Sequence, residues 1–303
     1  MTGVTEFGLF GARRERSIPP KKILVTGANG QVGRALRAEY GTRLGIEYTT
    51  RATFDVTAPG IETARRWHEY DAIINAAAYT AVDTAETPAG RTEAWLANVT
   101  AVAALARVAT AHDITLVHVS SDYVFDGSRD GHYVETDPLS PLGVYGQTKA
   151  AGDAVVQTVP RHYIVRTSWV IGDGKNFVRT MASLAGRGVD PAVVDDQVGR
   201  LTFTPTLATT IRHLIEKTAD YGTYNVTSSG EPTTWYDVAR AVFAAAGHDP
   251  DRVTPVTTEK YFADAAGPVA PRPRNSVLDT GRILATGVAV GDGSAELARY
   301  LAT

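Results

Sequence analysis

Residues 21–40 read KKILVTGANGQVGRALRAEY and predict a strand, a tight turn and a helix in succession. An apolar run typical of a buried strand is followed by Gly27, Gly30 and Gly33 at three-residue spacing, and then by a helical stretch. Glycine allows positive φ and lets the backbone approach a pyrophosphate, whose charge is met by amide groups and the positive end of the helix. The segment therefore predicts a dinucleotide site, and the strand and helix pattern that follows it favours this over a purely structural turn.

Strands and helices alternate along the rest of the chain. Strands are predicted at residues 23–26, 46–50, 72–75, 116–120 and 164–167, with helical stretches such as 61–67 and 93–111 between them. Beyond Trp169 the linkages lengthen, with helices predicted at 177–185, 207–218 and 235–246 and short strands near Val193 and Tyr224. We therefore expect the α/β class: a Rossmann-type doubly wound parallel sheet with a smaller mixed α/β substrate lobe.

The chain is expected to divide into three parts. Residues 1–20 contain a basic cluster and end in two prolines, which is typical of a linker or a disordered extension. Residues 21–168 are expected to form an NAD(P)-binding Rossmann domain. Residues 169–303 are expected to form mainly a substrate-binding lobe that is interleaved with this domain.

A second motif, VYGQTK, places Tyr145 and Lys149 four residues apart in a predicted helix, on one face. An ammonium near a phenol favours the phenolate, so we expect the pKa of Tyr145 to be lowered from ~10, within range for proton donation to a reduced carbonyl. Ser121 ends an apolar strand 24 residues before Tyr145, where ligands of such sheets bind. With the glycine turn, these three side chains predict a nicotinamide-dependent carbonyl reductase.

The end of the second predicted strand bears on the cofactor. In NAD-selective folds an acidic residue there binds the ribose 2′-hydroxyl, whereas this strand ends in Thr50 and is followed by Arg51. These side chains are suited to a 2′-phosphate. We therefore expect NADPH as the cofactor, with NADH as the alternative.

Composition excludes several classes of protein and site. The chain has 303 residues, 44% of them hydrophobic, and a net charge of −3, which gives no reason to expect nucleic acid or an acidic membrane as partner. The absence of cysteine excludes disulfides, thiolate metal sites and cysteine nucleophiles. No stretch is expected to reach the ~20 apolar residues of a membrane span, and no signal peptide is evident. A cytoplasmic location follows, and no metal site is assigned.

Longer blocks of the sequence resemble a known family. They are NAAAYTAVDTAE (75–86), SSDYVFDG (120–127), ETDPLSPLGVYGQTKAAGD (135–153), RTSWVIG (166–172), DDQVGRLTFTPTLA (195–208) and RPRNSVLDT (272–280). Over about residues 22–285 the chain resembles dTDP-4-dehydrorhamnose reductases, which are extended short-chain dehydrogenases/reductases. The resemblance implies reduction of the 4-keto group of dTDP-4-dehydro-β-L-rhamnose by NAD(P)H, the last step in making dTDP-L-rhamnose.

The resemblance also implies roles for individual residues. The catalytic residues are Ser121, Tyr145 and Lys149, with Ser121 keeping the hydroxyl where the family usually has threonine. The residues expected at the cofactor are Gly27, Asn29, Gly30, Gln31, Val32, Gly33, Thr50, Arg51, Asp55, Val56, Ala76, Ala77, Ala78, Asn98, Tyr145 and Lys149. Those expected at the sugar nucleotide are Thr80, Val82, Ser121, Tyr123, Trp169, Asn176 and Gln197.

Two other functions stay open. One is reduction of a different dTDP-4-keto-6-deoxy sugar, because motifs around C4 do not determine which face of the ring is presented. The other is a cofactor-binding regulatory subunit, against which the complete Ser121, Tyr145 and Lys149 set argues. The GRLTFT block and the proline-ended leader also resemble the reductase half of fusions with an upstream 3,5-epimerase. An upstream 3,5-epimerase domain or protein is therefore one candidate partner, and a homodimer is a separate alternative because the sequence does not determine the oligomeric state.

Overall fold

The computed structural model describes residues 22–302 and is built on a six-stranded sheet, in the order β10-β5-β4-β3-β1-β2, whose paired strands are all parallel. In chain order these strands are β1 (Lys22–Thr26), β2 (Ile46–Tyr48), β3 (Tyr70–Asn75), β4 (Thr115–Ser121), β5 (His162–Thr167) and β10 (Gly222–Asn225). The predicted doubly wound parallel sheet is confirmed. The linker predicted at residues 1–20 lies outside the described residues.

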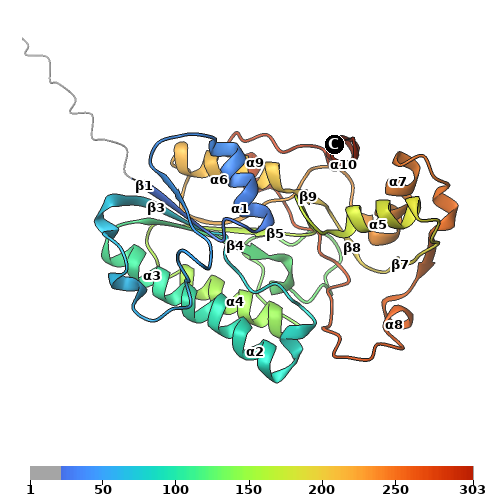
Figure 1. Cartoon of the computed structure of the whole chain (residues 1–303), viewed down its shortest axis with the longest axis horizontal. Helices are drawn as coiled ribbons and strands as arrows, with labels where there is room; N and C mark the ends of the chain where they lie inside the picture. Colours follow the sequence, from blue (N-terminus) through green and yellow to red (C-terminus); the bar gives the residue numbers. More distant parts are fainter. Residues whose placement is uncertain (1–21, 303) are drawn as a thin grey trace, which may run out of the picture.

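Helices cover both faces of this sheet (Figure 1). On one face lie α1 (Gln31–Tyr40) and α6 (Thr204–Glu216), and on the other α2 (Pro88–Trp95), α3 (Ala101–Ala111) and α4 (Val144–Val156). Successive strand residues point to opposite faces. In β1, for example, Leu24 joins the core under α3, and Val25 joins the core under α1 and α6. Both faces of β1 are thus buried, which explains why its sequence is a continuous apolar run and does not alternate apolar with polar residues.

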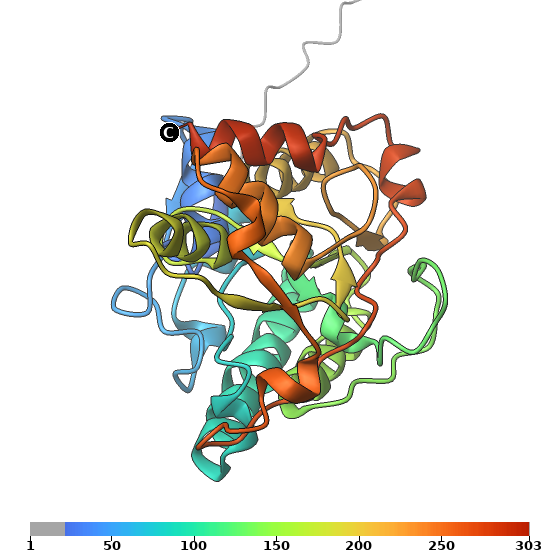
Figure 2. The same cartoon turned by 90° about the vertical axis from the view of Figure 1, so that its right-hand side faces the viewer.

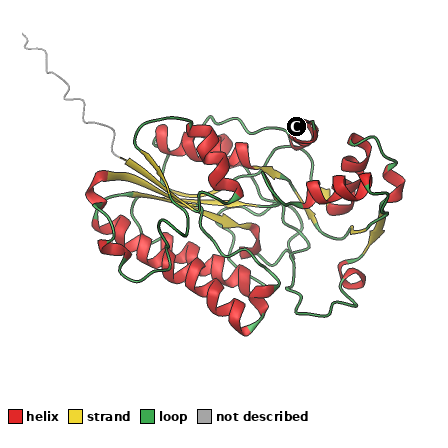
Figure 3. Ribbon diagram, in the orientation of Figure 1, coloured by secondary structure: helices red, strands yellow, loops and turns green. Residues whose placement is uncertain are grey.

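A smaller lobe lies beyond the carboxyl ends of the strands (Figures 2 and 3). Its elements are β6 (Val170–Ile171), α5 (Phe177–Gly186), β7 (Ala192–Val194), β8 (Val198–Gly199), β9 (Thr202–Phe203), β11 (Thr233–Thr234), α7 (Trp235–Ala245), β12 (Thr254–Val256), α8 (Thr258–Tyr261) and α10 (Gly293–Leu301). The short strands pair as β6 with β9, β7 with β12 and β8 with β11. Buried residues such as Phe203, Phe243 and Leu297 give this lobe its own core. The predicted mixed α/β lobe is confirmed.

The chain returns from this lobe to the sheet. The helix α6 and the strand β10 follow Trp169 in sequence, yet Leu207 and Tyr224 lie in the core of the sheet, together with Ile283 of α9 (Gly281–Leu284). Residues beyond 168 thus contribute to both parts of the molecule. The extent of each domain stays a prediction.

The predicted helix at residues 61–67 is wrong. The structure has two short 3₁₀ turns there, η1 (Ile61–Thr63) and η2 (Trp67–Glu69). The Ile61 carbonyl accepts from the Ala64 N–H and from the Trp67 indole at 3.0 Å, because the indole is buried in the sheet core. Tertiary packing therefore replaces the α-helical pattern with a tighter turn.

One helix in the described part of the chain is long and apolar enough, by length and composition alone, to cross a membrane. This helix spans Pro88–Ala111, 24 residues in which a π turn, η4 (Leu96–Thr100), joins α2 to α3, and its most apolar 18-residue window has a mean hydropathy of 1.4. This corrects the expectation that no stretch would reach that length. Half of its most apolar window is buried, and Val102 and Leu105 pack on the sheet, as in the core helix of a globular domain.

Candidate active site

The glycine turn between β1 and α1 is tightly packed. Gly27 has a φ of 68°, and a Cβ there would lie 2.7 Å from the backbone of Ala76. A Cβ on Gly33 would lie 2.3 Å from the Gly27 carbonyl oxygen. The helix α1 begins after Gly30 with no side-chain cap and no acidic residue in its first turn. The turn therefore leaves its first helical N–H groups for an anion.

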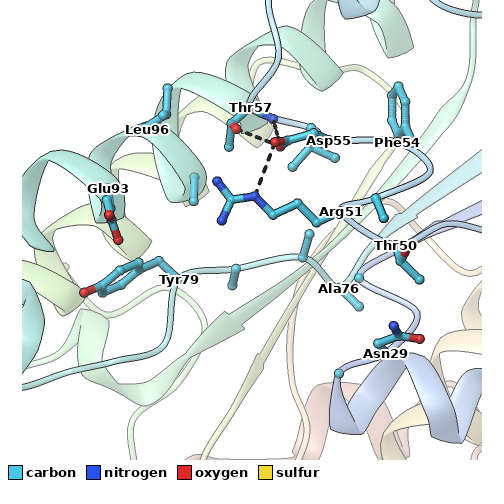
Figure 4. Close-up of a pocket in the computed structure, with 17 residues that line it drawn as sticks. Asn29, Thr50, Arg51, Phe54, Asp55, Thr57, Ala76, Tyr79, Glu93 and Leu96 are labelled. Carbon is cyan, nitrogen blue, oxygen red and sulfur yellow. Dashed lines mark hydrogen bonds and ion pairs between the residues drawn. The ribbon is translucent and has the colours of Figure 1, made fainter.

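A cavity of about 560 Å³, here called the turn cavity, lies against this turn (Figure 4). Of the residues predicted at the cofactor, it is lined by Gly27, Asn29, Gly30, Thr50, Arg51, Asp55, Val56, Ala76, Ala77 and Ala78. The Arg51 side chain is 85% exposed, and its Nε lies 3.3 Å from Asp55 Oδ2. Hydrogen bonds from the hydroxyl and N–H of Thr57 lower the pKa of Asp55. The Asp55 carboxylate, itself held by Thr57, thus orients the Arg51 guanidinium, which is exposed to solvent.

A second cavity of about 370 Å³, here called the tyrosine cavity, shares Gly30, Ala76 and Ala78 with the turn cavity. The other predicted residues that line it are Gln31, Val32, Thr80, Val82, Ser121, Tyr123, Tyr145, Lys149 and Trp169. Ser121 is the last residue of β4, and Tyr145 and Lys149 are one turn apart on α4. The structure therefore brings the glycine turn and the predicted catalytic set to one continuous site.

The Tyr145 phenol has an environment that the sequence did not predict. Burial and the charge of Asp122 raise its pKa to about 12, while a hydrogen bond with Ser121 acts in the opposite direction. The expectation that Lys149 lowers the pKa of Tyr145 is wrong for this structure. The Lys149 ammonium donates instead to the Val119 carbonyl at 2.7 Å and lies 3.2 Å from His118 Nε2. Burial also lowers the pKa of Lys149 to about 8.

A third cavity of about 510 Å³, here called the tryptophan cavity, lies in the smaller lobe and shares Tyr123 and Trp169 with the tyrosine cavity. Trp169 has a φ of 46°, which is rare for a bulky residue, and stacks on Trp235 with 3.8 Å between ring centroids. Gln197 also lines this cavity, and its Nε2 donates to Thr258 Oγ1 at 2.9 Å. A strained backbone such as that of Trp169 is found at ligand sites, where the surrounding packing holds the residue in its unfavourable conformation.

Three predicted residues line none of these three cavities, and one of them is Gly33, which is packed against Gly27 inside the turn. The Asn98 side chain accepts from the Tyr79 N–H at 2.9 Å and donates to the Tyr79 carbonyl and to Thr148, so it supports the loop after β3. Asn176 caps α5 and donates to the Gly172 carbonyl at 2.7 Å. Among residues 22–302, no group of three or more His, Cys, Asp or Glu side chains is placed to hold a metal.

Several residues that line the cavities were not predicted from the sequence, and three of them bring a charge or a large aromatic ring to the site. Asp122 lies in the tyrosine cavity, where burial raises its pKa to about 6. Trp235 and Arg272 line the tryptophan cavity, and Arg272 bonds both carboxylate oxygens of Asp83 at 2.9 and 2.8 Å. Asp122 and Arg272 belong to the blocks SSDYVFDG and RPRNSVLDT, which could have identified them. Nothing in the local sequence distinguishes Trp235.

Fold and site together define a class of protein. A doubly wound sheet whose glycine turn shares a cavity with a serine, and with a tyrosine and lysine one helical turn apart, is that of an NAD(P)-dependent short-chain dehydrogenase/reductase. Within this class, the chain belongs to the family whose model is described as the RmlD substrate binding domain, which matches residues 21–302. The family predicted from the sequence is therefore confirmed.

Curated relatives cover most of the chain. A dTDP-4-dehydrorhamnose reductase of Aggregatibacter actinomycetemcomitans is 38% identical over 279 residues, covering 86% of this chain and 92% of that protein. A dTDP-4-keto-6-deoxy-D-glucose reductase of Streptomyces niveus is 41% identical over 260 residues, covering 84% and 87%.

Solved structures agree with this assignment. A dTDP-4-dehydrorhamnose reductase of Clostridium acetobutylicum matches with a TM-score of 0.84 and 35% identity, covering 93% of this chain and 98% of that one. A dTDP-4-dehydrorhamnose reductase of Bacillus anthracis, solved in complex with NADP, matches with a TM-score of 0.83 and 31% identity over the same shares.

Proposed function

We propose that this chain reduces the 4-keto group of dTDP-4-dehydro-β-L-rhamnose with NADPH to give dTDP-L-rhamnose. The observation that carries the proposal is the continuity of the turn cavity and the tyrosine cavity, which share Gly30, Ala76 and Ala78. This continuity gives a dinucleotide held at the turn a direct path to Tyr145. Relatives of the same family that cover most of the chain are named as reductases of this substrate.

The residues around the turn cavity fit NADPH. The close packing at Gly27 and Gly33 leaves no space for side chains, so the backbone can approach a pyrophosphate beside the uncapped start of α1. Arg51, with Thr50 beside it, is suited to a 2′-phosphate, and a structure in the same family contains NADP. When bound, the reduced nicotinamide supplies the hydride for C4 of the sugar.

The side chains of the tyrosine cavity handle the carbonyl oxygen and its proton. The Ser121 hydroxyl orients the oxygen, Tyr145 gives it a proton, and Lys149 holds the ribose next to the nicotinamide. Because burial and Asp122 raise the pKa of Tyr145 to about 12, the phenol is protonated at neutral pH. Transfer to an alkoxide is still downhill, since its conjugate acid titrates near that of water, ~15.7. The phenol therefore keeps its proton until the oxyanion forms on the substrate and accepts it.

The tryptophan cavity is the proposed place of the nucleotide end of the substrate. Tyr123 and Trp169 line both this cavity and the tyrosine cavity, so a sugar between the two cavities would contact both rings. The aromatic walls of Trp169 and Trp235 suit a planar base, and Gln197 supplies a polar partner there.

A second candidate is direct reduction of dTDP-4-keto-6-deoxy-D-glucose without prior epimerisation. It is favoured by the 41% identity with the Streptomyces niveus enzyme named for that substrate. The two candidates share the chemistry of Ser121, Tyr145 and Lys149 and differ in the ring face presented to the hydride. Only the first requires a 3,5-epimerase to supply the substrate.

The test is NADPH oxidation with dTDP-4-keto-6-deoxy-D-glucose, with and without a separate 3,5-epimerase, followed by identification of the sugar product. Turnover that depends on the epimerase and yields dTDP-L-rhamnose supports the first candidate. Turnover without the epimerase supports the second. Binding of NADPH with no turnover in either case would overturn both candidates in favour of a regulatory subunit.

Location and assembly belong to the same proposal. A cytoplasmic location is proposed because both reactants carry phosphates, and charged groups do not cross a bilayer unaided. A homodimer and an upstream 3,5-epimerase partner remain predictions from the sequence.

A further inference from the structure

A single file of buried polar side chains lies beneath the tyrosine cavity and joins four elements. Thr26 Oγ1 at the end of β1 lies 2.7 Å from Asn75 Oδ1 on β3, and Asn75 Nδ2 lies 3.2 Å from His118 Nδ1 on β4. His118 Nε2 lies 3.2 Å from Lys149 Nζ on α4. All four side chains are at most 2% exposed, so they bond one another rather than bulk water. The file thus ends on one side at the glycine turn and on the other at the catalytic lysine.

Donor and acceptor rules leave two ways to complete this file. If Asn75 Oδ1 accepts from the Thr26 hydroxyl, its amide nitrogen donates to His118 Nδ1, and the neutral ring carries its proton on Nε2. That N–H then points at Lys149 Nζ, which accepts only as a neutral amine. If the Asn75 amide is rotated by half a turn, it accepts from Nδ1–H, and Nε2 accepts from the Lys149 ammonium. Each arrangement pairs both ring nitrogens of His118, and each requires one protonation state of the lysine.

His118 itself stays neutral in both arrangements. Burial and the nearby Lys149 charge hold its pKa well below the usual range. Other ionisable groups face this region. Asp153, also on α4, favours the Lys149 charge, but its carboxylate is bonded to Arg166 of β5 at 2.9 Å. Tyr145 lies one helical turn before Lys149 and stays protonated. Lys149 is therefore the titrating member of the cluster, and His118 is the neutral partner that must accommodate it.

We propose that His118 is a positioning residue for Lys149: its ring changes tautomer, together with rotation of the Asn75 amide, so that Nζ keeps the same anchor as ammonium and as amine. When Lys149 loses its proton to solvent, the ring keeps one proton throughout, which moves from Nδ1 to Nε2. The Val119 carbonyl accepts from Nζ in both states, at 2.7 Å. The remaining N–H of Nζ is then available to bind the ribose of the cofactor. Because this contact belongs to the proposed function, the expected effect of His118 on turnover rests on that function.

The tautomer change can be measured without substrate or cofactor. The ring ¹⁵N shifts of His118 are followed on histidine-labelled protein from well below to well above pH 8, the region in which Lys149 titrates. The chain has 7 histidines, and loss of one signal set in the His118→Gln variant assigns the residue. We expect Nδ1 to be protonated at the acid end and Nε2 at the alkaline end. A ring that keeps one tautomer throughout, or takes a second proton, overturns the proposal even if the protein is an active reductase.

Two variants test the consequence for turnover. The glutamine amide of His118→Gln reaches the place of Nε2 and can donate or accept by rotation, whereas the shorter His118→Asn reaches only the place of Nδ1. We expect the glutamine variant to keep kcat within about threefold and the asparagine variant to lose about tenfold to a hundredfold, because Nζ loses its anchor. The pH profile of kcat should have a midpoint that reports ionisation of Lys149. We expect this midpoint to shift in the asparagine variant and to stay unchanged in the glutamine variant. Equal losses in both variants, in proportion to lost thermal stability, would mean a purely structural role.

Discussion

Replacing Tyr145 by phenylalanine removes the proposed acid and little else. The ring sits edge-on against Tyr123 at 5.4 Å, a contact that phenylalanine keeps. The lost hydroxyl bonds Ser121, which retains Asp122 Oδ1 as a partner at 3.0 Å. We therefore expect a folded variant with nearly unchanged KM for NADPH and a large loss in kcat.

The size of this loss follows from the pKa of the phenol. With a pKa of about 12, Tyr145 is nearly four units more acidic than water at ~15.7, a difference worth about 5 kcal/mol for complete proton transfer. If the proton is about half transferred in the transition state, about 2.5 kcal/mol reaches kcat, or nearly a hundredfold. Loss of a positioned donor adds to this, so kcat should fall by about 10² to 10⁴.

The assay follows the absorbance of reduced nicotinamide at saturating substrate, and cofactor binding is measured separately. Tyr48→Phe is the matched control, because it makes the same chemical change outside the three cavities and removes only a long hydrogen bond, 3.4 Å to the Leu36 carbonyl. The control should keep wild-type kcat within about twofold. A Tyr145→Phe variant that kept more than a tenth of wild-type kcat would refute the assignment of the acid.

Three further outcomes are expected. Gly33→Ala should weaken NADPH binding at least tenfold and lower the free energy of unfolding by about 1–3 kcal/mol, as measured by cofactor titration and urea unfolding, since its Cβ would lie 2.3 Å from the Gly27 carbonyl oxygen. Arg51→Ala should raise KM for NADPH about tenfold and leave KM for NADH unchanged; equal changes for both would show that the guanidinium does not read the 2′-phosphate. Burial raises the pKa of Asp122 from 3.8 to about 6, so the folded state binds more protons between these values and stability falls as pH rises through them. Asp122→Asn should therefore gain up to about 3 kcal/mol over the wild type between pH 4 and pH 7 in urea unfolding, and a pH-independent difference would contradict this.

Much of the fold could be predicted because its signals are local. The apolar runs of β1 and β3 to β5 are buried on both faces, and the turn requires glycine at positions three residues apart, so both leave their pattern in the sequence. The failure at residues 61–67 has the opposite origin. The Trp67 indole bonds the Ile61 carbonyl because the sheet core surrounds it, and a local propensity does not contain that information.

Residue types and spacing by themselves determined the class of fold and predicted the glycine turn and the proposed catalytic set. These features depend on backbone periodicity and on short motifs whose parts lie within one helical turn or one strand end. Only the tertiary structure decided the electrostatics, because burial and distant neighbours set them. The pKa of Tyr145 rises instead of falling, since Lys149 turns to His118 and the Val119 carbonyl while Asp122 faces the phenol. A spacing of four residues places two side chains on one face of a helix, but the groups packed against that face determine which partner each side chain binds.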